Sequence, residues 1–133
     1  MNGTQEWIKF ADEDLTVAKA ALEKEVYNQA CFHAQQGVEK ALKGFLRSRQ
    51  RSVPKSHTLQ ELLAICQRLD ESFERLRVTC IQLDRFYIPT RYPDALPGML
   101  PEGLPARRDA EEAIELLQDA LDWIKQKVGL KNP

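Results

Sequence analysis

The side chains in this sequence best suited to chemistry are its two histidines, His33 and His57, and the arginines near them. Arg51 and His57 lie in one short basic segment that also contains Pro54. An imidazole titrates near neutral pH and can take a proton from a hydroxyl, while a guanidinium can bind a phosphate through two parallel hydrogen bonds. The alternative is structural, because His57 comes just before a residue that caps a helix. We favour the structural role for His57, and a packing or hydrogen-bonding role for His33.

Positive charge is concentrated in one segment of a chain whose formal net charge is −1. The residues expected to be charged between Lys40 and Gln60 are all cationic, namely Lys40, Lys43, Arg47, Arg49, Arg51 and Lys55. This segment could face an anionic partner, or its cations could interact with the negative end of a helix dipole. We favour the second interpretation. We also expect the ammonium groups of Lys40 and Lys43 to reach water while their stems cover apolar surface.

Apolar residues recur every three or four positions through most of the chain, which predicts amphipathic α-helices. We expect a first helix from about Thr4 to Glu25 and a second that begins at Tyr27. A capping box of Thr58 and Glu61 predicts the start of a third helix. A further helix follows a cap at Asp70 and Ser72, and the last runs from near Arg107 until Gly129 ends it.

Prolines interrupt the stretch between the last two predicted helices at Pro89, Pro93, Pro97, Pro101 and Pro105. Each proline lacks a backbone donor and disfavours helix in the residue before it. Long irregular loops in compact domains are usually functional or mobile, and we expect this loop to be mobile and to lie near the basic segment. No segment has the period of a β-strand. The sequence therefore predicts an all-α, up-and-down antiparallel helical bundle of about five helices, one domain over residues 1–133, with a long proline-rich loop before the last helix.

Several classes of site and location are disfavoured by the sequence. Cys31, Cys66 and Cys80 form no CxxC pair and fit apolar helical stripes, which predicts buried, reduced thiols. Zinc-site spacing, a P-loop and a GxSxG motif are all missing, so we expect no metal and no cofactor. No apolar run of about 18 residues occurs, and the first ten residues lack a secretory pattern. We expect a cytoplasmic protein that does not contact membranes.

Three segments, in the same order along the chain, resemble motifs of the HEPN family, which is named for nucleotide binding in higher eukaryotes and prokaryotes. The segment from Phe32 to Lys43 resembles the family's second-helix signature of paired glutamines, Glu-Lys and Leu-Lys. Lys55-Ser56-His57-Thr58-Leu59 is similar to its basic-x-His step into the third helix, with Thr58 where an aspartate is usual. Tyr87 to Ala95 is similar to its arginine–tyrosine–proline block, here Arg91-Tyr92-Pro93.

The resemblance implies a dimeric helical bundle that binds a nucleotide or RNA. Such proteins are often encoded beside a minimal nucleotidyltransferase in toxin–antitoxin-like pairs. Many members are metal-independent ribonucleases with an arginine followed a few residues later by a histidine. No histidine follows Arg91 before Pro97, whereas Arg51 and His57 have the required spacing.

Our leading hypothesis is therefore a non-catalytic, homodimeric module that partners a nucleotidyltransferase. Its candidate nucleotide- or RNA-binding residues are Lys40, Lys43, Arg47, His57, Arg91 and Tyr92. One alternative is an endoribonuclease toxin that uses Arg51 and His57, and another is a purely structural helical dimer. Arg91 and Tyr92 could bind a phosphate and stack on a base, or Tyr92 could plug the end of the bundle while Arg91 pairs with Asp94.

Apolar residues away from the main helical stripes support the expected dimer. They are Phe10 and Val17 in the first helix and Phe32 and Leu46 in the second. More apolar surface than one stripe requires indicates burial against a second subunit.

Overall fold

The fold is known from a computed structural model that describes residues 3–55, 58–87, 100 and 103–130. Within these residues it contains α1 (Thr4–Glu23), α2 (Tyr27–Ser48), α3 (Leu59–Leu69), the 3-10 helix η1 (Glu71–Leu76), α4 (Arg77–Asp84) and α5 (Arg107–Lys127). The predicted all-α fold is confirmed. The segment after Asp70 begins as a 3-10 helix and becomes α-helical only at Arg77. Most of the proline-rich loop, with Arg91 and Tyr92, lies outside the described residues, so its expected mobility and position stay predictions.

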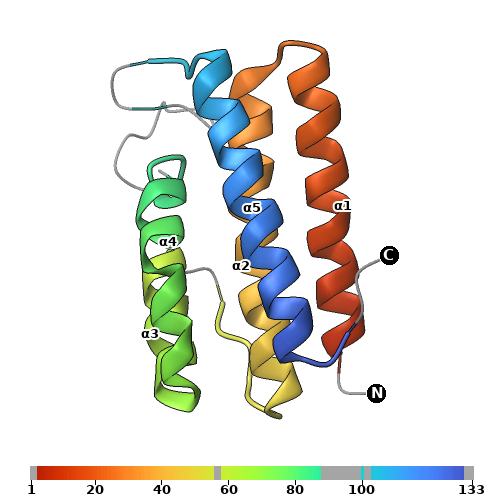
Figure 1. Ribbon diagram of the computed structural model, residues 1–133, viewed down its shortest axis with the longest axis vertical. Helices are drawn as coiled ribbons and strands as arrows, with labels where there is room; N and C mark the ends of the chain where they lie inside the picture. The colour runs from red at the N-terminus through yellow and green to blue at the C-terminus, as the bar shows by residue number, and fades with distance from the viewer. Residues whose placement is uncertain (1–2, 56–57, 88–99, 101–102, 131–133) are drawn as a thin grey trace.

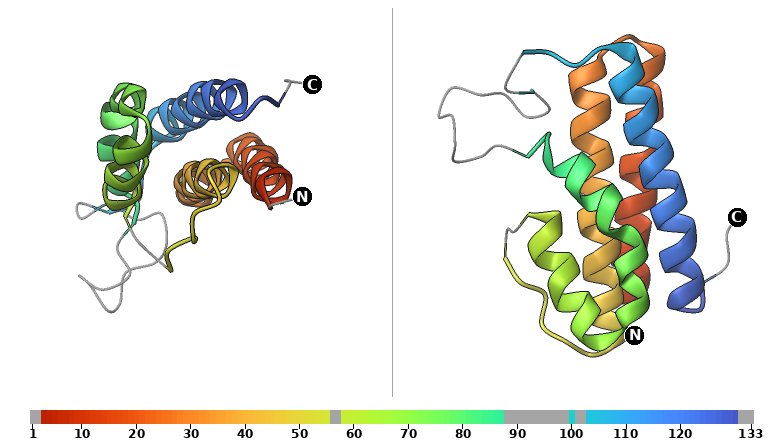
Figure 2. Two further views of the ribbon diagram at one scale, coloured as in Figure 1. Left: turned by 90° about the horizontal axis from the view of Figure 1, so that it is seen from below. Right: turned by 60° about the vertical axis from the view of Figure 1, so that its left-hand side comes forward.

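Helix α2 is the central element of the bundle. It packs against α1, α5, α3 and α4, as the views in Figure 1 and Figure 2 show. α1 runs antiparallel to α2, whereas the connection after α2 returns alongside it, so that α3 descends in the same direction as α2 (Figure 1). α4 then climbs and α5 descends. As a result α2, α3 and α5 all end at the same end of the bundle, where α1 begins.

Two glycines allow α2 to approach its neighbours closely. A Cβ atom at Gly37 would lie 2.8 Å from both terminal methyl groups of Leu117 on α5, and one at Gly44 would lie 3.1 Å from the Cδ1 atom of Ile8 on α1. Glycine inside a helix costs roughly 0.5–1 kcal/mol relative to alanine. Here that cost is offset by packing, because the space left by the missing side chains is filled by Ile8 and Leu117.

The core is formed by the predicted apolar stripes. Among its fully buried side chains are Val38, Leu42, Phe45, Leu46, Leu59, Leu62, Phe73, Leu83, Leu117, Leu121 and Ile124. The expectation that Leu46 belongs to a dimer surface is wrong, because the residue is 0 % exposed within one chain. The three cysteines are buried and free, as expected. Desolvation raises the pKa of each thiol to about 12, so all three are protonated and unreactive at neutral pH.

The start of α3 is fixed from two directions. The predicted capping box is present: the Thr58 hydroxyl accepts from the Glu61 amide at 3.2 Å, and the Glu61 carboxylate accepts from the Thr58 amide at 3.0 Å. In addition, the Asp84 carboxylate at the end of α4 accepts from the backbone amides of Leu59 at 2.8 Å and Gln60 at 3.0 Å. One acidic side chain thus satisfies two unpaired donors of a neighbouring helix.

Three helices end in the same type of cap. After α1, α2 and α5 a residue of positive φ follows, Glu25 (64°), Gln50 (58°) and Gly129 (80°). After α2, the Gln50 amide donates to the Arg47 carbonyl and the Arg51 amide to the Leu46 carbonyl, both at 2.9 Å. This pair of bonds defines a Schellman motif, which glycine favours at the left-handed position.

Replacing Gln50 by glycine should therefore stabilise the protein. The left-handed conformation costs a non-glycine residue about 1 kcal/mol, and Gln50 is exposed, so no packing is lost. We expect Gln50→Gly to raise the free energy of unfolding by about 1 kcal/mol in urea denaturation. Gln50→Ala, which removes the same side chain but keeps the strain, should have little effect. An equal gain in both variants would contradict this explanation.

Candidate functional site

A buried carboxylate joins α1 to α2. Asp14 of α1 is 5 % exposed. One of its oxygens accepts a 2.8 Å hydrogen bond from Nδ1 of His33, and the other accepts a 2.7 Å bond from Nζ of Lys40. Both partners lie on α2, about two turns apart, and therefore on one helix face. We call these three residues the Asp14 cluster.

The Asp14 cluster has two physical consequences. Its opposite charges satisfy a carboxylate that would be costly to bury alone, which fixes the register of α1 on α2. In addition, the contact between Nδ1 of His33 and this carboxylate fixes the orientation of the ring, as a carboxylate does for the imidazole of a catalytic base. The His33 side chain is 28 % exposed, so part of the ring reaches solvent. The hydrogen-bonding role expected for His33 is thus observed.

Lys43 is buried rather than solvated. Its side chain is 9 % exposed, its Nζ lies 2.7 Å from an oxygen of Glu39, and the ammonium lies 5.5 Å from the ring centroid of Trp7. The expectation that this ammonium reaches water is wrong, because the first turns of α1 cover that face of α2. Lys40 keeps partial exposure but is paired with Asp14. The two lysines proposed as anion ligands therefore already neutralise acids within the chain.

The paired glutamines bond within α2. Nε2 of Gln36 donates to Oε1 of Gln35 at 2.8 Å and to Oε1 of Glu39 at 3.4 Å. Nε2 of Gln35 is buried and has no hydrogen-bond acceptor among the described residues. The segment that resembles the second-helix signature thus builds a polar network along α2, and these bonds do not reach another helix.

Cations from several elements gather where α2, α3 and α5 end. This surface, the basic end, consists of Arg47, Arg49 and Arg51 after or near the end of α2, Arg68 in the last turn of α3, Arg75 of η1 and Lys127 of α5. Arg49 donates to the Leu69 carbonyl at 3.3 Å, and Arg47 donates to the Arg51 carbonyl at 3.0 Å. The favoured role of these cations, interaction with helix C-termini, is therefore observed for Arg49, because Leu69 is the last residue of α3, whereas the carbonyl of Arg51 lies beyond the end of α2.

One carboxylate holds the basic end together. Asp70 accepts from the hydroxyl of Ser72 at 2.6 Å, and its Oδ2 lies 2.9 Å from Nζ of Lys127 and 3.9 Å from Nη2 of Arg49. Hydrogen bonds from Ser72 and Lys127 lower the pKa of this carboxyl to about 2, so it is ionised at neutral pH. Asp70 neutralises part of the charge. The exposed guanidinium groups of Arg51 and Arg68 have no acidic partner among the described residues.

Trp123 of α5 contacts two of the cations of the basic end. The guanidinium of Arg75 lies 5.2 Å and the ammonium of Lys127 lies 5.3 Å from its ring centroid, while Phe73 meets it edge-on at 4.8 Å. Phe73 in turn packs on Phe45 of α2 at 4.2 Å. Trp123, Arg68, Arg75 and Lys127 were not predicted as site residues from the sequence. The sequence does show basic residues in the last turns of α3 and α5. Their proximity to the end of α2 depends on the directions of the helices in the bundle, which the sequence pattern did not predict.

The candidate Arg51–His57 pair stays a prediction. Arg51 is exposed, directly after the cap of α2. His57 lies outside the described residues, as do Arg91 and Tyr92. Of the six candidate binding residues, the described ones are Lys40, Lys43 and Arg47, and Arg47 alone of these lies at the basic end.

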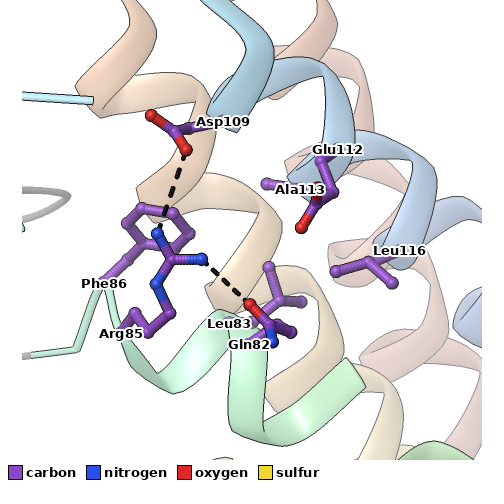
Figure 3. A pocket seen from close by; sticks show the side chains of 8 residues that line it. All are labelled: Gln82, Leu83, Arg85, Phe86, Asp109, Glu112, Ala113 and Leu116. Carbon is purple, nitrogen blue, oxygen red and sulfur yellow. Dashed lines mark hydrogen bonds and ion pairs between the residues drawn. The ribbon is translucent and has the colours of Figure 1, made fainter. Parts of the chain in front are cut away.

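A shallow depression lies between α4 and α5 (Figure 3). Arg85 donates to the side chain of Gln82 at 2.9 Å and lies 3.9 Å from Asp109. Asp109 also accepts from the Ala106 amide at 2.8 Å, at the start of α5. The polar groups drawn between these two helices thus bond mainly to one another. We therefore interpret the depression as a packing contact between α4 and α5 rather than as a ligand site.

The described residues contain neither a metal-binding group of side chains nor a membrane-spanning helix. In that part of the chain no three His, Cys, Asp or Glu side chains are grouped closely enough to hold a metal ion. No helix in the described ranges is long and apolar enough to cross a bilayer.

The helical bundle, its α2 polar network and the comparisons with known proteins define the class. The model of the HEPN domain matches residues 4–127. The chain is a member of the HEPN family. The resemblance inferred from the three sequence segments is thereby confirmed.

Individual relatives support the same assignment. A protein of Methanocaldococcus jannaschii named "Putative toxin MJ1304" is 30 % identical over an alignment 142 positions long, which covers 94 % of this chain and 90 % of that protein. The crystal structure of TT1696 from Thermus thermophilus matches with a TM-score of 0.76 at 38 % identity, and covers 96 % of this chain and 99 % of its own. ST0689, described as an archaeal HEPN homologue, matches with a TM-score of 0.74 at 30 % identity over the same shares.

The Asp14 cluster predicts that neutralising Asp14 lowers the free energy of unfolding far more than neutralising its neighbour Glu13. Asp14→Asn removes the charge that pairs with Lys40 and should lower the free energy of unfolding by about 2 kcal/mol. Glu13→Gln changes an exposed acid that has no described partner and should cost less than about 0.5 kcal/mol. Urea denaturation followed by circular dichroism measures both. Equal costs would show that the Asp14 pairs do not fix α1 on α2.

Proposed function

We propose that this HEPN protein is a nucleotide- or RNA-binding module, itself non-catalytic, that works as a homodimer beside a nucleotidyltransferase in a toxin–antitoxin-like pair. The observation that carries the proposal is the basic end, where cations from α2, α3, η1 and α5 lie on one surface. The relative named as a toxin supports the toxin–antitoxin setting. The nucleotidyltransferase partner rests on the family resemblance.

The charges of the basic end favour an extended anion. Asp70 has two cationic neighbours, while Arg51 and Arg68 have no acidic partner in the described part of the chain and are exposed. Exposed cations gathered at one end of the bundle attract a polyphosphate chain, since each phosphate that binds releases counterions. We therefore propose the basic end as the binding surface, with Arg47 as the member already expected from the sequence.

An endoribonuclease is the second candidate. It is favoured by the name of the toxin relative and by His33, whose ring is oriented by its contact with Asp14. A general base also requires a phosphate clamp nearby, and Lys40, the cation that shares Asp14 with His33, is already paired with that acid. We therefore place the non-catalytic function first.

The proposed dimer uses the outer side of α1. Phe10 and Val17 are 45 % and 44 % exposed, and Phe32 of α2 is partly buried. α5 lies on one side of the α1/α2 pair, and no described helix covers α1 on the other side (Figure 2). Exposed apolar residues that flank a helix pair are typical of subunit contacts.

Binding should be electrostatic and should occur without cleavage. If about three phosphates are contacted, a fourfold rise in salt should weaken binding of a single-stranded RNA by about 20-fold. The double variant Arg51→Gln/Arg68→Gln should bind more weakly and with a smaller salt dependence. Lys24→Gln/Arg108→Gln removes the same charge at the opposite end of the bundle and should bind like the wild type. Fluorescence anisotropy measures affinity, and gel analysis of the same RNA measures cleavage.

Each outcome of that experiment separates the candidate functions. Cleavage that is lost in His33→Ala or in His57→Ala would make the protein a ribonuclease. Equal weakening by the two double variants would rule out the basic end as the binding surface. Neither binding nor cleavage would leave a purely structural dimer.

The dimer predicts a position-specific effect of charge. Phe10→Glu places a carboxylate in the proposed interface and should convert the dimer to a monomer in light scattering at micromolar concentration. Val78→Glu is the matched control, because Val78 is 65 % exposed on α4, away from α1. A monomeric wild type, or a dimer that Phe10→Glu leaves intact, would contradict the proposed interface.

A further inference from the structure

We propose that Trp123 is a stacking surface for an unpaired nucleobase, with the cations around it holding the adjacent phosphates. The inference rests on the proposed function and names its ligand class, single-stranded RNA. It starts from the contacts of the indole ring, which has two cations within 5.3 Å of its centroid and an aromatic edge at 4.8 Å. None of these residues was singled out from the sequence.

The aromatic residues behind Trp123 hold the ring in place. Phe73 meets it edge-on and itself packs on Phe45, and both phenylalanines are fully buried in the core. Trp123 is only partly buried. A ring that packs against the core and is still partly accessible to solvent loses little conformational freedom when a base stacks on it.

The two cations at the ring differ in how firmly they are held. Lys127 is tied to Asp70 at 2.9 Å. Arg75 is exposed and has no hydrogen bond or ion pair among the described residues, so its contact with the ring is a cation–π interaction alone. Such a contact is weak at an exposed site. An incoming base can therefore displace the guanidinium, which is then free to bind the phosphate of the same nucleotide through paired hydrogen bonds.

The arrangement favours an unpaired strand over a duplex. Stacking on Trp123 requires an exposed base face, and bases inside an A-form helix have none. An aromatic ring beside a cationic surface is the combination by which single strands are bound without sequence preference. Arg51 and Arg68 add two exposed cations to those of the Arg49–Asp70–Lys127 contacts, which suits a chain of phosphates better than one phosphate.

Tryptophan fluorescence gives a direct test, because the chain has two tryptophans. Trp7→Phe leaves Trp123 as the reporter, and Trp123→Phe leaves Trp7, whose ring also has a lysine, Lys43, at 5.5 Å. The probes are a single-stranded oligoadenylate, an RNA duplex of equal length, AMP and tripolyphosphate. We expect the oligoadenylate to quench Trp123 strongly and Trp7 little, and the duplex, AMP and tripolyphosphate to quench Trp123 far less. Anisotropy measured in parallel reports whether each RNA binds.

A second variant tests the stacking contribution to affinity. Trp123→Leu keeps an apolar side chain against Phe73 but removes the aromatic face, and should weaken oligoadenylate binding by about tenfold. Arg75→Gln should weaken it by a smaller factor and leave the quenching. Circular dichroism verifies that both variants are folded.

The outcomes separate this inference from the proposed function. Binding of oligoadenylate without quenching of Trp123, or equal quenching by tripolyphosphate, overturns the stacking surface while RNA binding stands. Quenching by AMP as strong as that by the oligonucleotide replaces RNA by a free nucleotide as the ligand. No anisotropy change with any RNA overturns the proposed function together with the inference.

Discussion

The carboxylate of Asp14 is the constraint around which the rest of this structure is arranged. An acid buried between α1 and α2 requires donors, and His33 and Lys40 supply them from one face of α2. With α1 held there, its first turns cover Lys43, which pairs with Glu39 beneath Trp7. The charged residues in the middle of α2 are therefore paired within the protein. The cations that remain available for a ligand lie at the basic end.

The direction of the helices explains why those remaining charges form one surface. The connection after α2 returns along the bundle, so that α3 ends beside α2 rather than at the opposite end (Figure 1). Cations near the ends of α2, α3 and α5 each interact favourably with the negative end of a helix. Local helix stability and an anion-binding surface thus require the same residue types at the same places. Asp70, with its lowered pKa, keeps part of this charge balanced.

The fold could be predicted from the sequence because its signals are local. Apolar spacing, the Thr58–Glu61 capping box and Gly129 predict helices whose ends agree closely with those observed. The candidate site was harder to predict, since ion pairs such as Asp14–Lys40 join residues far apart in the chain. The periodicity of apolar residues does not indicate which charged residues pair with each other. Leu46 was misassigned for a related reason: a helix surrounded by neighbours on three sides is apolar well beyond one stripe. Trp123 was not predicted as a site residue because the sequence does not show that Arg75 of η1 lies against it together with Lys127 of α5.

The close contact between Gly37 and Leu117 constrains how this sequence can change over evolution. Any side chain at position 37 needs space that Leu117 occupies, and a smaller residue at position 117 alone leaves a void beside α2. Neither single step is neutral, whereas the exchange of both together preserves the total volume. Substitutions at these two positions should therefore be correlated among related proteins, so that α2 and α5 evolve as a pair although they are distant in the chain.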